Sequence, residues 1–206
     1  MTGHPSFGTG DSARLDPAAN VPPLPINEVE RLRALGAFRP FLHPHDPPMT
    51  SLARQAAALC HAPMGLVSVM EADEQRVLGG CGLSFDRVDR CDTICATTIL
   101  QPDVLVVEDA TLDPRFQNLP GVLGPPFARF YAGAPFFDRG GLPLGTVCAV
   151  ASQPRGLSSR AALSLRRLAT LAAAVLEVRL LAASSRDHAR LNALILTFVE
   201  ARSSGD

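Results

Sequence analysis

The chain has 206 residues, of which 47% are hydrophobic and 19% charged, and it carries a formal net charge of -1. This length allows one compact domain with an appended helix or tail, and the balanced charge argues against nucleic acid as a partner. All 19 basic residues are arginine, which excludes a lysine Schiff base and the lysine of a P-loop.

The first segment that predicts regular structure begins at Asn27. Residues 1–26 are rich in Gly, Pro, Ser and Ala, which bury little apolar surface, so we expect a disordered tail. Asn27 followed by Glu30 is typical of a capping box, and Gly36 is expected to end this helix. The apolar stripe of the helix would comprise Val29, Leu32 and Leu35.

A second helix and a first β-hairpin follow. The helix is expected over residues 50–60, before Pro63. Residues 64–70, MGLVSVM, are apolar on both faces as in a central strand, and an EADE turn leads to a second strand at 75–81. After a polar loop, CATTIL at 95–100 predicts a short helix.

Another strand and a second hairpin come next. Residues 104–109, VLVVED, predict a strand. The DPRF segment combines an N-cap at Asp113 with proline at the first position of a helix. Two further strands are expected at 128–137 and 142–151, joined by the turn DRGG.

The C-terminal part of the chain predicts helix. Residues 158–183 carry apolar residues at alternating steps of three and four, which is typical of an amphipathic helix. The polar segment SSRDHA is expected to interrupt this helix before the pattern resumes at 191–199. The stripe of the first part comprises Leu168, Leu171, Val175 and Val178.

The order of these elements predicts an α+β domain. We expect a domain at 27–183 in which an antiparallel sheet packs against helices on one face, followed by a helical extension at 184–206. The opposite face of the sheet would then be left for a pocket.

Several features predict a soluble, cytoplasmic protein. The opening segment MTGHPSFGTGDSARLD lacks the apolar core of a secretory signal. The apolar stretch at 168–183 is interrupted by Glu177 and Arg179, and it falls short of the ~20 residues that a membrane span needs. Five cysteines without a CxxC pair are expected to be reduced thiols, as in the cytosol.

Several segments resemble the GAF domains found at the front of bacterial sensor kinases and diguanylate cyclases. The similarity covers residues 27–181 and is densest in VLVVEDATLDPRFQNLPGVLGPPFARFYAGAPFF and GLPLGTVCAVASQPRGLS. The resemblance implies a six-stranded antiparallel sheet, a pocket under its covering loops, and terminal helices that form parallel dimers and pass signals onward. Because FRPFLHPHDPP, QRVLGGC and AVASQPR depart from the family pattern, we expect an altered pocket rim.

Cys95 is the first candidate site residue. It precedes the short helix, at a position that resembles one facing the pocket in this family. A thiol there could hold a chromophore, a metal or an oxidant, or could be buried as a small apolar group. Cys91 would lie on the same side of a helix, and a zinc site would also need His43 and His45. We expect no metal site and leave the cofactor unknown.

A second group of candidates surrounds the strand at 128–137. Arg129 and Tyr131 share one face of that strand. If this face lines the pocket, Arg129 could bind an anion and Tyr131 could stack and donate a hydrogen bond. Alternatively, Arg129 pairs with Asp109 or Asp113 as a structural lock. The candidate ligand-binding residues are therefore Cys95, Asp109, Arg115, Phe116, Arg129 and Tyr131.

These observations favour a sensor domain over an enzyme. We expect it to bind a small molecule or sense redox state, to form homodimers through its C-terminal helices, and to regulate a separate histidine kinase or diguanylate cyclase. Neither nucleic acid nor a membrane is an expected partner. One alternative is a thiol enzyme that resembles the free methionine sulfoxide reductases, which are also GAF domains, with Cys81, Cys91 and Cys95 around the pocket. The other is a ligand-free dimerisation scaffold.

Overall fold

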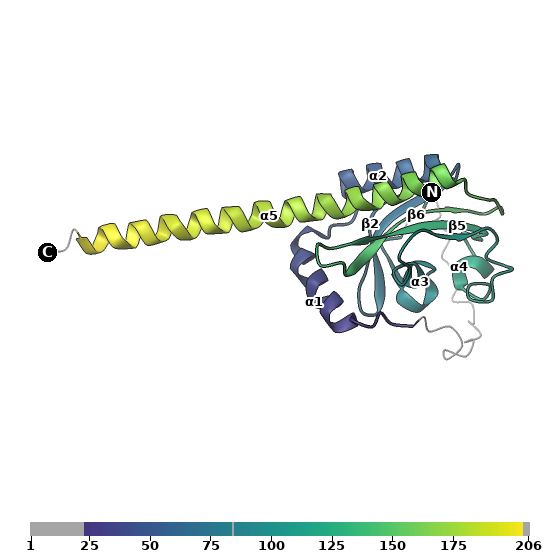
Figure 1. The fold of residues 1–206 in the computed structure, drawn as a ribbon, viewed down its shortest axis with the longest axis horizontal. Coiled ribbons are helices and arrows are strands. Elements are labelled where there is room, and N and C mark those ends of the chain that lie inside the picture. Colours follow the sequence, from purple (N-terminus) through teal and green to yellow (C-terminus); the bar gives the residue numbers. More distant parts are fainter. Residues whose placement is uncertain (1–22, 84, 204–206) are drawn as a thin grey trace, which may run out of the picture.

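The computed structural model describes the backbone of residues 23–83 and 85–203, and the side chains up to residue 186. Most of the predicted tail, residues 1–26, lies outside the described residues. Within them, six strands form one sheet in the order β3-β2-β1-β6-β5-β4 (Figure 1). All neighbouring strands in this sheet are antiparallel. The predicted α+β architecture is confirmed.

The predicted hairpins are present, with one additional strand. The strands are β1 Met64–Met70, β2 Glu74–Cys81, β3 Arg87–Asp89, β4 Leu105–Val107, β5 Phe130–Phe137 and β6 Pro143–Ala151. The sequence pattern missed β3 because this strand is short and mostly exposed, so it lacks the alternation of a half-buried strand.

The two faces of the sheet are covered differently. The long helices α2, Pro47–Leu59, and α5, Ser159–Ser203, lie on one face (Figure 1). The one-turn helices α3, Cys95–Thr98, and α4, Pro120–Leu123, lie on the other. The helix α1, Glu28–Phe38, packs against β6 and α5 and continues into the 3-10 turn Arg39–Phe41.

Close contact between α2 and the sheet explains two glycines in the hairpin. A Cβ atom on Gly79 would lie 2.2 Å from the backbone nitrogen of Thr50, and one on Gly65 would lie 2.2 Å from the carbonyl oxygen of Ala53. Larger residues would push α2 away from the sheet. Of the Gly-Gly pair in QRVLGGC, Gly79 therefore belongs to this helix–sheet contact, whereas a Cβ atom on Gly80 would lie 3.1 Å from the side chain of Leu66.

The helix α1 differs from its prediction in three ways. The side chain of Asn27 makes no capping hydrogen bond with any described residue, and the helix continues through Gly36 to Phe38. Val29 is 71% exposed, whereas Arg31 is fully buried. The predicted apolar stripe was wrong at Val29, because a charged cluster that includes Arg31, and not apolar contact, fixes this end of the helix.

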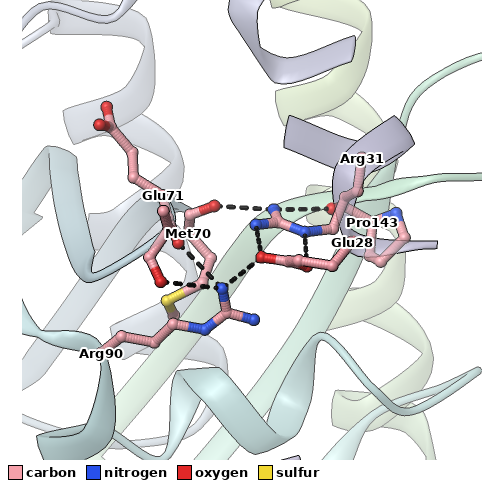
Figure 2. Close-up of polar contacts among 7 residues, drawn as sticks. Glu28, Arg31, Met70, Glu71, Arg90 and Pro143 are labelled. Atoms are coloured by element: carbon pink, nitrogen blue, oxygen red, sulfur yellow. Dashed lines mark hydrogen bonds and ion pairs between the residues drawn. The ribbon is translucent and has the colours of Figure 1, made fainter. Parts of the chain in front are cut away.

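This cluster joins Glu28 to two arginines (Figure 2). Arg31 donates to both carboxylate oxygens of Glu28, at 2.6 and 2.8 Å, and to the carbonyl oxygen of Met70 at 2.7 Å. Arg90 donates to Glu28 at 2.5 Å and to the carbonyl oxygen of Glu71 at 3.1 Å. The cluster therefore ties α1 to the β1–β2 turn and to the 3-10 turn Arg90–Asp92.

The ionisation of Glu28 contributes to stability. Burial by itself would raise the pKa of this carboxyl group, but the hydrogen bonds and positive charges of Arg31 and Arg90 outweigh it, so the pKa is lowered. A lowered carboxyl pKa stabilises the fold above the pKa of the unfolded chain. This stabilisation is lost as the pH falls through the lowered value.

The predicted break at SSRDHA was wrong. The helix α5 is continuous from Ser159 to Ser203, because the segment holds neither Gly nor Pro and its residues cost only tenths of a kcal/mol each in a helix. The inward stripe is also rotated from its predicted position, since Leu171 and Val178 are 52% and 63% exposed. The buried residues of α5 are Leu165, Leu168, Ala169, Ala172 and Leu176.

One stretch of α5, residues 159–186, is long and apolar enough by length and composition to cross a bilayer, considering the described residues only. This is weak evidence for a membrane span, because the core helix of a soluble protein meets the same criterion. The stretch contains the inward stripe of α5 that packs against the sheet.

Glu28→Gln should lower the free energy of unfolding by about 2–4 kcal/mol, because it leaves the buried guanidinium groups of Arg31 and Arg90 without their negative partner. Denaturant unfolding at neutral pH measures this change. Glu30→Gln is the matched control, since Glu30 is exposed in the same turn. Equal stability of the two variants would contradict the proposed role of the cluster.

Candidate functional site

The face of the sheet opposite α2 and α5 borders a cavity of about 410 Å³. Its floor is formed by side chains of the central strands, among them Leu66 of β1, Tyr131 of β5 and Cys148 of β6. Its walls come from Leu83, from residues 85–95 and from residues 119–128 around α4. Most of the lining is apolar, with a few polar groups, as is usual for sites that bind small molecules.

A line of polar side chains crosses the sheet at one end of the cavity. Thr93 donates to the amide oxygen of Gln75 at 2.5 Å, and the amide nitrogen of Gln75 donates to the hydroxyl of Ser68 at 2.7 Å. Ser68 in turn shares a hydrogen bond of 3.2 Å with Thr146. Gln75 lines the cavity and is only 2% exposed, so this network fixes its amide group in position.

A second polar group surrounds Cys95. Its sulfur lies 3.4 Å from the hydroxyl of Tyr131 and 3.9 Å from the sulfur of Cys148. The hydroxyl of Tyr131 also forms a hydrogen bond of 2.7 Å with Thr98. All four residues are buried, and they join α3 to β5 and β6.

The surroundings of these sulfurs separate their pKa values. A hydrogen bond from Cys148, with smaller contributions from Thr146, Tyr131 and Thr93, outweighs burial and lowers the pKa of Cys95 to about 6. The same hydrogen bond and burial raise the pKa of Cys148. The pKa of Tyr131 is raised by burial, so this phenol is neutral. Cys95 is therefore the group of this trio that is most readily ionised.

Two charged residues line the outer part of the cavity. The side chain of Arg87 is 58% exposed and pairs with Glu74 at 2.6 Å. Asp92 also lines the cavity, next to the exposed Cys91, whose thiol lies 3.7 Å from the Asp92 carboxylate. The cavity thus combines an apolar interior with charges of both signs on its lining.

The structure separates the predicted site residues into three groups. Cys95 and Tyr131 lie together on the cavity. Asp109 and Arg115 line a different, open groove beside β4. Phe116 is buried beneath Arg115, with the guanidinium carbon 4.7 Å from the ring centre. These last three residues therefore cannot contact a ligand in the main cavity.

Arg129 acts structurally, but not through the expected carboxylates. It donates to the carbonyl oxygens of Val122 and Ala128, at 2.9 and 3.0 Å, and so holds α4 over the cavity. In the described structure Asp113 instead pairs with Arg115, and Asp109 accepts a hydrogen bond from the Thr111 hydroxyl. The predicted pairing of Arg129 with Asp109 or Asp113 is therefore wrong for the described residues, because backbone carbonyl oxygens take the place of the carboxylates.

Sequence reasoning missed Cys148, Gln75 and Thr98. A signal was available for the first two, since alternation along β6 and β2 places them on the same face as other cavity residues. Thr98 gave no such signal, because a single threonine in a short helix has no periodicity to read.

The possible zinc ligands do not come together. Cys91 is exposed and Cys95 buried, so the expectation that their sulfurs share one side of a helix was wrong. Cys91 lies in the 3-10 turn Arg90–Asp92, and the extended backbone of Thr93 separates this turn from α3. His45 is exposed and lies 3.5 Å from Asp86. Among the residues that the structure describes, no group of three or more potential metal ligands comes together.

The GAF domain family matches residues 49–176. The chain belongs to this family. A cyclic di-GMP phosphodiesterase of Pseudomonas aeruginosa is 35% identical to this GAF protein over 151 residues, which are 73% of this chain and 26% of that protein. The chain therefore spans about a quarter of the length of that relative.

Solved structures show the same fold. The GAF domain of a phosphoenolpyruvate-protein phosphotransferase from Coxiella burnetii superposes with a TM-score of 0.54 at 16% identity, covering 76% of this chain and 99% of that one. A free methionine-R-sulfoxide reductase from Neisseria meningitidis, in complex with its substrate, gives 0.50 at 17% identity, covering 77% and 96%. Since both a domain of a phosphotransferase and a reductase share this fold, function has to be argued from the site.

Proposed function

We propose that this GAF domain is a cytoplasmic sensor, not itself an enzyme, which binds a small molecule or responds to redox state and regulates a signalling partner. The cavity of about 410 Å³ on the sheet carries this proposal. Its volume lies within the ordinary range for small-molecule sites. A ligand in it would contact the one-turn helices α3 and α4, which lie outside the core that packs against α2 and α5. The partner would be a histidine kinase, a diguanylate cyclase or, by analogy with the Pseudomonas relative, a cyclic di-GMP phosphodiesterase.

The lining indicates the chemistry of the ligand. A mostly apolar molecule would fill the space against Leu66 and Val150, and one polar end would meet the fixed amide of Gln75. Arg87 and Asp92 on the lining would favour a ligand that carries both a hydrogen-bond donor and an acceptor.

In this proposal, β6 and α5 connect the cavity to the signalling partner. Cys148 and Val150 of β6 line the cavity, and β6 leads into α5 after a short loop. Further along α5, Arg179 pairs with Asp46, the N-cap residue of α2, at 2.6 Å. A change in the position of β6 would therefore reach both long helices.

The outward face of α5 supports a parallel homodimer. Leu171 and Val178 are seven residues apart and exposed, and Leu181 continues the face with 47% exposure. Apolar residues repeated with this spacing favour helix pairing. We expect two copies to pair along this face, so that a movement of one α5 changes its register or angle against the other.

A thiol enzyme is the second candidate function, and the buried Cys95 on the cavity is the observation that favours it. Of the other cysteines expected around the pocket, Cys81 and Cys91 are not on its lining. If the natural protein reduces free methionine sulfoxide and the Cys95→Ser variant does not, the protein is an enzyme and the sensor proposal is wrong. A protein that binds no compound and only dimerises would instead be a scaffold.

Filling the cavity should abolish ligand binding. Gly121 lines it, and a Cβ atom there would meet only Pro126, at 3.7 Å, so Gly121→Leu should fold and occupy part of the space. In thermal-shift assays with nucleotides, amino acids and bilins, a compound that stabilises the natural protein should not stabilise this variant. Gly36→Leu, a helical glycine with open space around its Cβ, is the control that should retain the response. Equal shifts in both variants would contradict the assignment of the site.

Charges on the outward face of α5 should dissociate the dimer. We expect a dimer at micromolar concentration by light scattering, and a monomer for the double variant Leu171→Glu with Val178→Glu, because pairing would bury like charges. Ser184→Glu adds a charge to an exposed position on a different side of the same helix and should leave the mass unchanged. A natural protein that is strictly monomeric would rule out this mode of output.

A further inference from the structure

Two of the five free cysteines lie side by side on the lining of the cavity. Cys95 on α3 and Cys148 on β6 have their sulfurs 3.9 Å apart, although 53 residues separate them in the sequence. Both residues line the cavity, so a small solute that enters it reaches the pair without unfolding the domain. The other three, Cys60, Cys81 and Cys91, are not on this lining.

Two donors lie within reach of the sulfur of Cys95. The hydroxyl of Thr98 donates to the carbonyl oxygen of Ile94 at 3.2 Å, so next to a neutral Cys95 it accepts from the hydroxyl of Tyr131. When Cys95 is ionised, the hydroxyl of Tyr131 can instead donate to its sulfur, which lies 3.4 Å away. The thiol of Cys148 can donate to the same sulfur. Cys95 is therefore the sulfur whose ionised form is stabilised by two donors.

We propose that Cys95 and Cys148 form a redox-active dithiol, which a peroxide entering the cavity oxidises to an intramolecular disulfide. This inference rests on the proposed sensor function and names its redox input. A cysteine that only packs in the core would need neither a second sulfur 3.9 Å away nor hydrogen-bonding groups arranged around its own sulfur.

The reaction balances with peroxide as the only co-reactant. The thiolate of Cys95 attacks one oxygen of hydrogen peroxide, the O–O bond breaks, and the sulfur becomes a sulfenic acid while the released hydroxide takes up a proton to give water. The sulfur of Cys148, on losing its proton, attacks the sulfur of Cys95 and expels the hydroxyl group as a second water. Two thiols and one peroxide thus give one disulfide and two waters.

Disulfide formation would alter the cavity. The sulfurs must approach each other by about 2 Å to reach bonding distance. The helix α3 has only four residues, so it is the element that can move toward β6. The hydrogen bond between Tyr131 and Thr98 would have to adjust, and β6 passes the change to α5.

The pH dependence of the reaction follows from the groups that face Cys95. These are Cys148 of β6 and Tyr131 of β5, with Asp92 and Arg87 elsewhere on the cavity lining. Because the pKa of Cys95 is lowered to about 6, the thiolate is the main form at pH 7. The rate of peroxide consumption should fall about tenfold between pH 7 and pH 5.

The test treats the reduced, full-length protein with one equivalent of hydrogen peroxide. Titratable thiols should fall from five to three, because one disulfide uses two, and the intact mass should fall by about 2 Da. Digestion without reduction should release a Cys95–Cys148 linked peptide. In Cys148→Ala no such peptide forms, and a sulfenic-acid reagent should label Cys95. Cys91→Ser, which removes an exposed thiol, should react as the natural protein does.

Each remaining outcome overturns the proposal. A disulfide between other cysteines, or oxidation that stays at the exposed Cys91, would show that the pair is only buried structure. Cooperative unfolding of the Cys148→Ala variant checks that this variant is folded. The Cys95→Ala variant removes the other sulfur of the pair and should likewise form no linked peptide. Ligand binding is measured separately on reduced protein, so loss of the redox reaction alone leaves the small-molecule function in place.

Discussion

The two faces of the sheet are both buried but differ in chemistry, and the rest of the structure depends on this difference. Alternate residues of β1, β5 and β6 point to opposite faces. On one face, Val67, Phe130 and Ala132 pack against α2 and α5 in an apolar core. On the other, Ser68, Thr146 and Cys148 bring polar atoms and sulfur under short, irregular segments. The first face fixes the long helices, and the second can hold a cavity without weakening them.

Polar contacts hold α1, α3 and α4 in position around the sheet. Glu28, between two buried arginines, holds α1 to the turn that begins β2, and Arg129 holds α4 through carbonyl oxygens. Cys95 and Tyr131 link α3 to the strands. In the proposed function, a ligand or an oxidant at the cavity would act on α3 and on β6, and the close-packed core beneath α2 and α5 would transmit the movement as a unit.

Much of this structure could be predicted from the sequence, and the exceptions have physical causes. Strand patterns and turn residues were sufficient for both hairpins, and the apolar periodicity was sufficient to predict a C-terminal helix, although not its continuity or its inward stripe. The buried Arg31 could not be predicted, because its burial depends on Glu28 and on carbonyl oxygens from distant turns. Cys95 and Tyr131 were recognised as candidates, whereas Cys148 was missed, because only the pairing of β5 with β6 and the position of α3 bring the two sulfurs together.

The central claim is that the cavity on the face of the sheet opposite α2 and α5 is the sensing site. Native mass spectrometry of the protein purified under reducing conditions from its own host tests this claim most directly. We predict a bound small molecule on the natural protein that is absent when Gly121 is replaced by leucine. Unliganded mass for the natural protein, or the same adduct on both, would contradict it.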